Sequence, residues 1–149
     1  MRFVRFSKKH LPAFNAMLRQ AKGEFGAAWA SHMRSVFSRQ GCRACGLSAY
    51  AVLEGSRLSA AFSTRREVEA FVLYFIIISK ESQGKGMGTE IVRRVEAMAR
   101  KEGAKFLRLD IYRGKKVALF YRKLGFKAGG RVRQYEEDGD DQTFLYKRL

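Results

Sequence analysis

The order of apolar and polar residues along the chain predicts a single domain in which strands mix with helices. Alternating or continuous apolar stretches predict strands at residues 2–6, 47–53, 58–63, 68–78, 105–111, 126–135 and 143–149. Apolar residues that recur every three or four positions predict helices at about residues 11–22, 27–39, 89–103 and 115–124, with a break at 41–46. This mixture indicates an α/β or α+β fold.

The strongest strand pattern covers residues 68–78. Its apolar run over residues 71–78 does not alternate with polar residues, so we expect other elements to cover both faces of the strand. By the two-residue period of a strand, Glu67 and Glu69 share one face at its start and Tyr74 lies on the other. This strand is therefore predicted to be buried, with carboxylates at its beginning.

A glycine-rich turn connects this strand to the next predicted helix. Residues 83–88 read Gln-Gly-Lys-Gly-Met-Gly. Glycines allow a backbone to approach a ligand closely, and a helix N-terminus presents unpaired N–H groups at the positive end of its dipole. The turn is neither a P-loop nor a dinucleotide fingerprint, because it lacks the Lys-Ser/Thr of the first and the glycine spacing of the second. It is a candidate site for an anion such as a pyrophosphate, and a simple turn between two elements is the alternative.

A second motif follows after a further helix and strand, where residues 121–126 read Tyr-Arg-Lys-Leu-Gly-Phe. Together, residues 83–88 and 121–126 resemble the motifs of the GNAT superfamily of N-acetyltransferases, and residues 143–149 resemble its last strand. The resemblance is specific from about residue 68 onward. It implies one N-acetyltransferase domain over residues 1–149, with a mixed, mostly antiparallel central sheet, a splayed central strand and about four helices.

The resemblance also implies acetyl-CoA as the donor in a transfer of an acetyl group to a primary amine, which attacks the thioester directly. Backbone groups near Ile76 and Ile78 are implied to hold the pantetheine arm. The implied phosphate-binding residues form the turn that follows: Gln83, Gly84, Lys85, Gly86, Met87 and Gly88. Three further cations, Arg113, Lys115 and Lys116, are candidates for the 3′-phosphate.

The resemblance places Tyr121 where the family commonly has the acid that protonates the departing CoA thiolate. A phenol with its ordinary pKa of about 10 stays protonated at neutral pH and can donate a hydrogen bond to a thiolate. A base is also needed, because only a neutral amine is nucleophilic, and Glu69, ahead of Glu67, is the candidate. Alternatively, both carboxylates are solvated and pair with Arg65 and Arg66.

Three positions differ from the family's common pattern. Many members have a proline shortly before the glycine turn, where this chain has Ser79 and Lys80. Alanine is common four residues before the tyrosine, where this chain has Val117. The asparagine that often opens the last helix is replaced by Gly114, so one side-chain contact to CoA is not expected.

Composition adds a strong positive charge to this picture. The chain has 149 residues, with 30 Lys+Arg against 14 Asp+Glu and a formal net charge of +16. Such a charge favours polyanions, namely nucleic acid, an anionic membrane surface or a multiply phosphorylated small molecule. CoA accounts for only some of these cations. The remainder keeps an alternative open: a nucleic-acid-directed protein that acetylates RNA-linked amines or mainly binds RNA, although no RNA-binding aromatic signature is present.

The acidic residues are unevenly distributed, since five of the 14 fall within residues 136–141, between the last two predicted strands. The resemblance implies that the acceptor amine binds on this side. The stretch therefore has two interpretations: it attracts a cationic acceptor, such as a polyamine, an aminoglycoside-like amine or a basic peptide, or it is a solvated hairpin tip.

Two further features of the sequence, its lack of long apolar segments and its cysteine pair, concern cellular location and metal binding. No stretch reaches the roughly 20 apolar residues of a membrane span, and the N-terminus lacks the apolar core of a secretory signal, so a cytoplasmic location is expected. Cys42 and Cys45 form one C-x-x-C pair, which His10 and His32 do not complete to a zinc site. Reduced thiols in a turn are the favoured interpretation, and metal binding or redox chemistry of this pair stays the alternative. No metal cofactor is predicted for the reaction, and the protein is expected to be a monomer or a homodimer.

Overall fold

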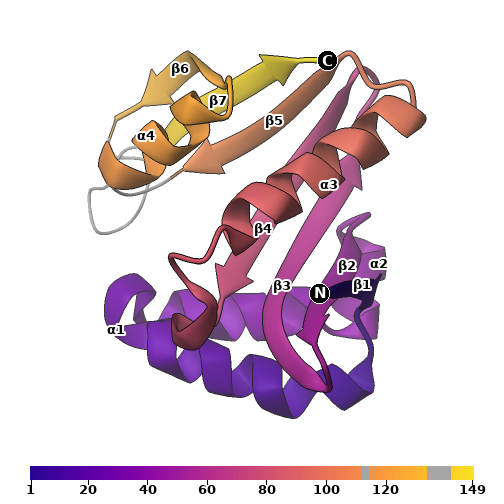
Figure 1. Ribbon diagram of the computed structural model, residues 1–149, viewed down its shortest axis with the longest axis vertical. Coiled ribbons are helices and arrows are strands. Elements are labelled where there is room, and N and C mark those ends of the chain that lie inside the picture. Colours follow the sequence, from indigo (N-terminus) through magenta and orange to yellow (C-terminus); the bar gives the residue numbers. More distant parts are fainter. Residues whose placement is uncertain (112–114, 134–141) are drawn as a thin grey trace. The chain divides into compact units, whose positions relative to one another are not determined.

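The computed structural model describes residues 1–111, 115–133 and 142–149, with side chains for all of these except 22–26, 39–41 and 115. Within these residues the chain forms seven strands and four α-helices (Figure 1). The strands are β1 (Arg2–Arg5), β2 (Ser48–Glu54), β3 (Arg57–Arg66), β4 (Ala70–Ile78), β5 (Phe106–Ile111), β6 (Lys127–Val132) and β7 (Gln142–Arg148). The helices are α1 (Leu11–Val36), α2 (Arg39–Ala44), α3 (Met87–Lys101) and α4 (Lys115–Lys123), with 3-10 turns η1 (Lys8–His10) and η2 (Lys80–Ser82).

The strands form a seven-stranded sheet in the order β1-β2-β3-β4-β5-β7-β6. Antiparallel pairing joins β1 to β2, β2 to β3, β5 to β7 and β6 to β7. The pair β4–β5 is parallel, and its register covers Ala70–Val72 against Phe106–Arg108. Strand β4 continues to Ile78 beyond that register, and the expected mixed, mostly antiparallel central sheet is confirmed.

The chain divides into two compact units that share β4 and α3. The first unit comprises residues 1–65 and 75–88, and the second comprises residues 66–74 and 89–149. The first unit therefore holds the glycine turn, and the second holds Tyr121. No helix within the described ranges is long and apolar enough to cross a membrane.

The core of the first unit lies between α1 and the inner face of β2 and β3. Phe14, fully buried on α1, stacks on Phe37 with ring centroids 4.4 Å apart and meets Phe75 edge-on at 6.2 Å. The buried members of this cluster are apolar residues, most of them from α1, β2, β3 and β4: Phe14, Met17, Leu18, Ala30, Met33, Val36, Phe37, Leu47, Ala51, Leu53, Leu58, Ala61 and Phe75. One continuous apolar face of α1 thus anchors the N-terminal strands.

The two helices predicted at 11–22 and 27–39 are a single helix, so that prediction is wrong. Helix α1 runs without a break through Gly23 and Gly26 to Val36. A glycine inside a helix costs about 1 kcal/mol relative to alanine, whereas burying one methionine side chain gains about 1.5–3 kcal/mol. Ala30 and Met33 continue the buried face of the first turns, and this burial outweighs the glycine penalty. The break expected at residues 41–46 is also wrong in part, because Arg39–Ala44 forms α2.

The start of β4 differs from the sequence prediction in a way that matters for the site. Strand β3 extends to Arg66, and β4 begins only at Ala70. The intervening residues form a hairpin turn in which the Glu67 N–H donates to the Ala70 carbonyl (2.8 Å) and Val68 is 93% exposed. Glu67 and Glu69 therefore lie in a turn, and the prediction that they share one face of a strand is wrong.

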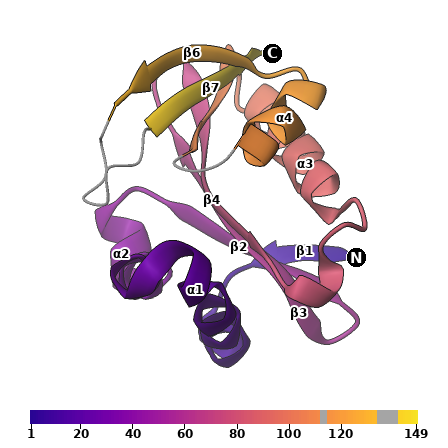
Figure 2. The same cartoon turned by 90° about the vertical axis from the view of Figure 1, so that its left-hand side faces the viewer.

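The second unit packs α3 and α4 on one side of its strands (Figure 2). Ile91, Val92 and Val95 of α3 are buried, as are Leu107 and Leu145 from β5 and β7. A polar contact reinforces this packing: the Glu96 carboxylate of α3 accepts hydrogen bonds from Lys147 Nζ on β7 (2.7 Å) and from Arg100 (2.8 Å). Burial opposes ionisation of Glu96, but these two cations hold its pKa below the usual value.

Candidate functional site

The glycine turn links β4 to α3 in the first unit and has the backbone of an anion site. Gly84 and Gly86 have φ angles of 71° and 80°, in the left-handed region that glycine adopts at little cost. No heavy atom lies within 4 Å of the position where either glycine would carry a Cβ. Helix α3 then begins at Met87, and the first four N–H groups of a helix have no acceptor within it. The turn therefore exposes backbone donors at the positive end of a 15-residue helix.

The segment before the turn is held by short-range hydrogen bonds. The Gln83 side chain donates from Nε2 to the Ile78 carbonyl (3.0 Å), and its backbone N–H donates to the Ser79 carbonyl (3.1 Å). Gln83 thus shapes the turn through both its side chain and its backbone. The Ser79 N–H donates to the Ser59 carbonyl of β3 (2.9 Å), which fixes where the chain leaves β4.

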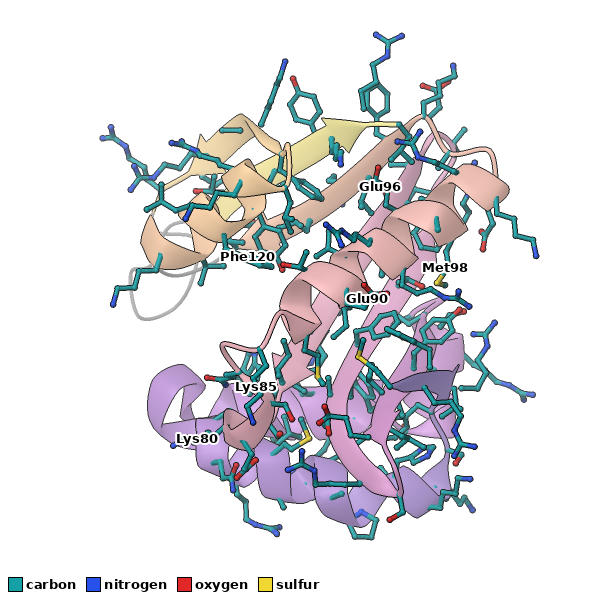
Figure 3. All side chains as sticks on the ribbon, viewed as in Figure 1. Lys80, Lys85, Glu90, Glu96, Met98 and Phe120 are labelled. Atoms are coloured by element: carbon teal, nitrogen blue, oxygen red, sulfur yellow. The ribbon has the colours of Figure 1, made fainter. Side chains whose placement is uncertain are left out.

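Two lysines of the first unit lie in or just before this turn. Lys80 and Lys85 are exposed, on η2 and in the turn itself (Figure 3). Met87 is 5% exposed and anchors the first turn of α3 in the core, so its contribution to an anion site is its backbone. The combination of free amides, a helix N-terminus and nearby ammonium groups suits a phosphate-bearing ligand.

The later part of β4 contributes backbone groups next to the turn. Ile76 and Ile78 are partly buried, and Phe75 just before them is buried in the core of the first unit. Earlier in the strand, the consecutive burial of residues 71–73 confirms the expectation that other elements cover both faces there. Tyr74, at 39% exposed, is the exception in this apolar run.

Tyr121 lies on α4 in the second unit and is 5% exposed. Its ring meets Phe120 and Phe126 edge-on, with centroids 4.9 and 5.5 Å apart. The Phe126 N–H donates to the Tyr121 carbonyl (3.1 Å), so the loop after α4 folds back on this residue. Burial raises the pKa of Tyr121 to about 12, which keeps the phenol protonated well above neutral pH.

This burial predicts a loss of stability at high pH. The unfolded phenol loses its proton near pH 10.0, whereas the folded one keeps it up to about pH 12. Between those values the folded state binds more protons, so its stability falls as pH rises, by roughly 1–3 kcal/mol for this group. Urea unfolding of the wild type and Tyr121→Phe, at about pH 9 and about pH 11.5, measures the difference. If the free energy of unfolding depended on pH in the same way in both proteins, the raised pKa of Tyr121 would be contradicted.

The two candidate base carboxylates lie in the β3–β4 turn and already form ion pairs in the second unit. Glu67 Oε2 is 3.1 Å from Arg108 Nη1, and both of these side chains are partly buried. Glu69 Oε1 is 2.6 Å from Lys105 Nζ, and both of these side chains are exposed. The partners thus include cations other than the expected Arg65 and Arg66.

Several predicted cofactor residues lie outside the described part of the chain. Arg113 and Gly114 are among residues 112–114, and the Lys115 side chain is also left undescribed. Lys116 is exposed on the first turn of α4. The acidic stretch at residues 136–141 likewise lies outside the described residues.

A comparison with known protein families shows to which family the chain belongs. Residues 46–128, more than half of the chain, match the family model described as the acetyltransferase (GNAT) domain. The chain belongs to the GNAT acetyltransferase family. The match includes the glycine turn, both turn carboxylates and Tyr121. Among curated proteins, none matches the sequence significantly.

Solved structures share the GNAT fold over most of the chain. A GNAT-family acetyltransferase structure from Desulfovibrio desulfuricans is 18% identical with a TM-score of 0.85, covering 99% of this chain and 98% of that one. Ribosomal-protein-alanine N-acetyltransferase from Brucella melitensis is 18% identical with a TM-score of 0.77, covering 100% of both chains. A Bacillus subtilis acetyltransferase in complex with CoA is 19% identical with a TM-score of 0.64, covering 75% of this chain and 84% of that one. The predicted GNAT fold is confirmed.

Several polar pairings of this GNAT chain could not be found from the sequence. Arg108 pairs with Glu67 and Lys105 pairs with Glu69, in each case across more than 30 residues of sequence. No local sequence pattern predicts such pairs. Glu54 and Ser82, which are joined by a hydrogen bond of 3.0 Å, form a second link of this kind. Only the tertiary fold brings such residues together.

The two cysteines of this GNAT chain are not joined by a disulfide in the structure. Cys42 lies on α2, where its Sγ donates to the Val36 carbonyl (3.1 Å), and Cys45 is exposed just after the helix. Over the described ranges, no three His, Cys, Asp or Glu side chains gather as a metal site would require.

Proposed function

We propose that this GNAT chain is an acetyl-CoA-dependent N-acetyltransferase, one domain over residues 1–149, that transfers an acetyl group to a primary amine by direct attack. The observation that carries the proposal is the turn at residues 83–88, where two glycines at positive φ open a 15-residue helix. Its open backbone and its exposed Lys85 fit the diphosphate of CoA in charge and in steric demand. A solved protein of the same fold, from Bacillus subtilis, is in complex with CoA, which supports the choice of donor.

In this proposal, each group of site residues has its own role toward acetyl-CoA. Backbone groups at Ile76 and Ile78 hold the pantetheine arm, and the amides of residues 84–88 hold the diphosphate. Lys116, with residues 113 and 115, attracts the 3′-phosphate. Acetyl-CoA, when bound, supplies the activated acetyl group as a thioester whose leaving group is a thiolate. Tyr121 donates a hydrogen bond from its hydroxyl to the developing negative charge.

The base is the residue that takes the proton of the attacking amine, and we assign it to Glu69 ahead of Glu67. The Arg108 guanidinium contacts both oxygens of Glu67, at 3.1 and 3.4 Å, and the two side chains are only partly exposed. The Glu69 pair with Lys105 is a single exposed contact, which opens at little free-energy cost. Glu69 is therefore the carboxylate that is more readily released to accept a proton, directly or through water.

Glu69→Gln tests this assignment. We expect kcat to fall roughly tenfold near neutral pH, with the loss recovering as pH rises, because an exposed base that works through water is partly replaced by hydroxide. The matched control is Glu102→Gln, an exposed carboxylate at the end of α3, which should leave kcat unchanged. Unchanged kcat and an unchanged pH profile in Glu69→Gln would remove Glu69 from the mechanism.

The acceptor is defined only as a primary amine. Solved proteins with this fold include a ribosomal-protein-alanine N-acetyltransferase and an aminoglycoside 6′-N-acetyltransferase, so the fold alone does not choose between protein and small-molecule amines. The acidic stretch at residues 136–141 keeps a cationic acceptor as a prediction. The nucleic-acid alternative rests on the net charge of +16 alone. A cytoplasmic location and the choice between monomer and homodimer also stay predictions.

Labelled acetyl-CoA provides the test of the function. The chain is incubated with a polyamine, an aminoglycoside, a basic peptide with a free N-terminus and an aminoacyl-tRNA, and label transfer is measured. We expect transfer to at least one amine and direct binding of CoA in calorimetry. Absence of CoA binding would overturn the proposal, whichever acceptors are present.

A further inference from the structure

The hairpin between β2 and β3 carries a polar cluster that reaches the segment before the glycine turn. Glu54, the last residue of β2, gathers three donors on one carboxylate oxygen, all within the first unit. Its Oε2 accepts hydrogen bonds from Ser59 Oγ (2.7 Å), Arg57 Nη2 (2.9 Å) and Ser82 Oγ (3.0 Å). Arg57 Nη2 also lies 3.3 Å from Ser82 Oγ. The cluster joins residues that are 28 positions apart in the sequence.

Ser82 is the member of this cluster next to the turn. It is the last residue of η2, is 1% exposed and immediately precedes Gln83. Its backbone N–H donates to the Ser79 carbonyl (2.9 Å), so both its side chain and its backbone are fixed. Ser59, which is fully buried, also accepts the Ser79 N–H at its carbonyl (2.9 Å). The segment from Ser79 to Ser82 is thus tied to the hairpin at both of its ends.

The charge on Glu54 strengthens this tie, and the 41% exposure of its side chain means that solvent weakens the ion pair with Arg57 more than the contacts to the buried Ser59 and Ser82. Hydrogen bonds to an ionised acceptor are roughly twice as strong as those between neutral groups. The donors from Ser59 first and Ser82 next, with Arg57, hold the pKa of Glu54 below its usual value, so the carboxylate stays ionised at neutral pH. Beyond Ser82 the chain enters two glycines at positive φ, where the backbone has little restraint of its own. The contacts of Ser82, together with those of Gln83 to the Ile78 and Ser79 carbonyls, therefore fix where that stretch starts.

We propose that Glu54 is a positioning residue: its carboxylate holds Ser82 and thereby presets the turn at residues 83–88 for the diphosphate of CoA. This inference rests on the proposed function, because the ligand of the turn is taken from it. A preset turn lowers the ordering cost of binding, and so it acts on the affinity for acetyl-CoA. It leaves the chemical step alone, because Glu54 touches neither the acceptor nor the thioester.

Electrostatics alone would have the opposite effect on the affinity for acetyl-CoA, so the two explanations can be distinguished by experiment. Removing a negative charge near a polyanion's site strengthens binding of the polyanion. Glu81, which is exposed and adjacent to Ser82, provides the control for that effect; its own contacts, to its backbone N–H and to the Ser79 side chain, are of a kind that a glutamine oxygen also accepts. A charge effect predicts a lower KM for acetyl-CoA in both Glu54→Gln and Glu81→Gln. The positioning role predicts a higher KM in Glu54→Gln only.

The experiment compares Glu54→Gln, Ser82→Ala, their double variant and Glu81→Gln with the wild type. We expect Glu54→Gln to raise both KM for acetyl-CoA and the calorimetric Kd of CoA about tenfold, with kcat within about twofold. Ser82→Ala removes the hydroxyl that the carboxylate holds and should raise them by a similar factor, and the double variant should be no worse than either single variant, since both act on one link. Glu81→Gln should leave KM unchanged or lower it. Thermal unfolding of each variant confirms that it is folded.

The outcomes separate this inference from the proposed function. If the wild type does not bind CoA, the proposed function fails and the turn has another ligand. If the wild type binds CoA but Glu54→Gln and Ser82→Ala bind it equally well, the positioning role is wrong and the proposed function stands. If the effects of Glu54→Gln and Ser82→Ala on CoA binding multiplied in the double variant, the two residues would act independently, and the link between them would be overturned. Should Glu54→Gln fail to fold, Ser82→Ala alone decides, because it keeps the charge of Glu54 and removes only the contact.

Discussion

Tyr121→Phe is expected to lower kcat for acetyl transfer by about a hundredfold or more, while KM for acetyl-CoA changes little. General acid–base groups and preorganised donors typically contribute factors of this size or larger. The substitution removes only the hydroxyl, and the ring contacts with Phe120 and Phe126 at 4.9 and 5.5 Å remain available. The fold should therefore survive, and the lost rate reports the lost donor.

The raised pKa of Tyr121 indicates how the hydroxyl acts. A thiol has an ordinary pKa of about 8.5, whereas burial raises the pKa of Tyr121 to about 12, so complete proton transfer from the phenol to the thiolate is uphill. The hydroxyl is thus better suited to donate a hydrogen bond to developing charge than to give up its proton. It also stays protonated to high pH, so Tyr121 should cause no alkaline fall in kcat below about pH 11.

Steady-state kinetics of Tyr121→Phe, with Tyr146→Phe as the control, test this prediction. The control makes the same chemical change in the second unit, on the partly buried Tyr146 of β7, and should keep kcat within about twofold of the wild type. A wild-type kcat in Tyr121→Phe would show that the hydroxyl is not the donor. An alkaline fall centred near pH 10 in the wild type would contradict the buried environment of the phenol.

Local patterns in the sequence account for most of the fold and for the outline of the site. The burial of residues 71–73 and of the periodic stripe of Ile91, Val92 and Val95 needs no long-range information, because a non-alternating apolar run predicts a strand covered on both faces and a 3.6-residue period predicts one buried helix face. The glycine turn is equally readable, since positive φ angles at Gly84 and Gly86 favour glycine. These features lie in the structure where the sequence pattern places them.

Features that depend on tertiary contacts could not be predicted in the same way. Gly23 suggests the end of a helix, but burial of Ala30 and Met33 carries α1 through it to Val36. The strand period places Glu67 and Glu69 on one strand face, because nothing local shows that β3 extends through residue 66 and that a turn follows. Ion pairs stabilise that turn, and they join residues that are far apart in sequence.

Replacing both Gly84 and Gly86 with alanine is expected to weaken CoA binding by at least about thirtyfold. An L-residue in the left-handed region costs about 1–2 kcal/mol, which is about five- to thirtyfold in affinity per position if binding has to restore the glycine conformation. The surroundings do not add a steric term, because no heavy atom lies within 4 Å of the place that the new Cβ would take at either position. The free turn would relax to angles that alanine accepts, and its amides would lose their common direction. Calorimetric titration with CoA measures the loss.

Gly103→Ala is the matched control for this double variant. Gly103 follows the other end of α3, with a φ angle of 67° and equally open surroundings, so alanine suffers the same backbone strain there. Both variants should lose some thermal stability, but only the change in the turn should lower the affinity for CoA. If the double variant binds CoA as tightly as Gly103→Ala does, the amides of the turn are not the diphosphate site. A loss confined to the double variant would instead assign the binding energy to backbone geometry, because alanine changes neither the charge of the turn nor its lysine.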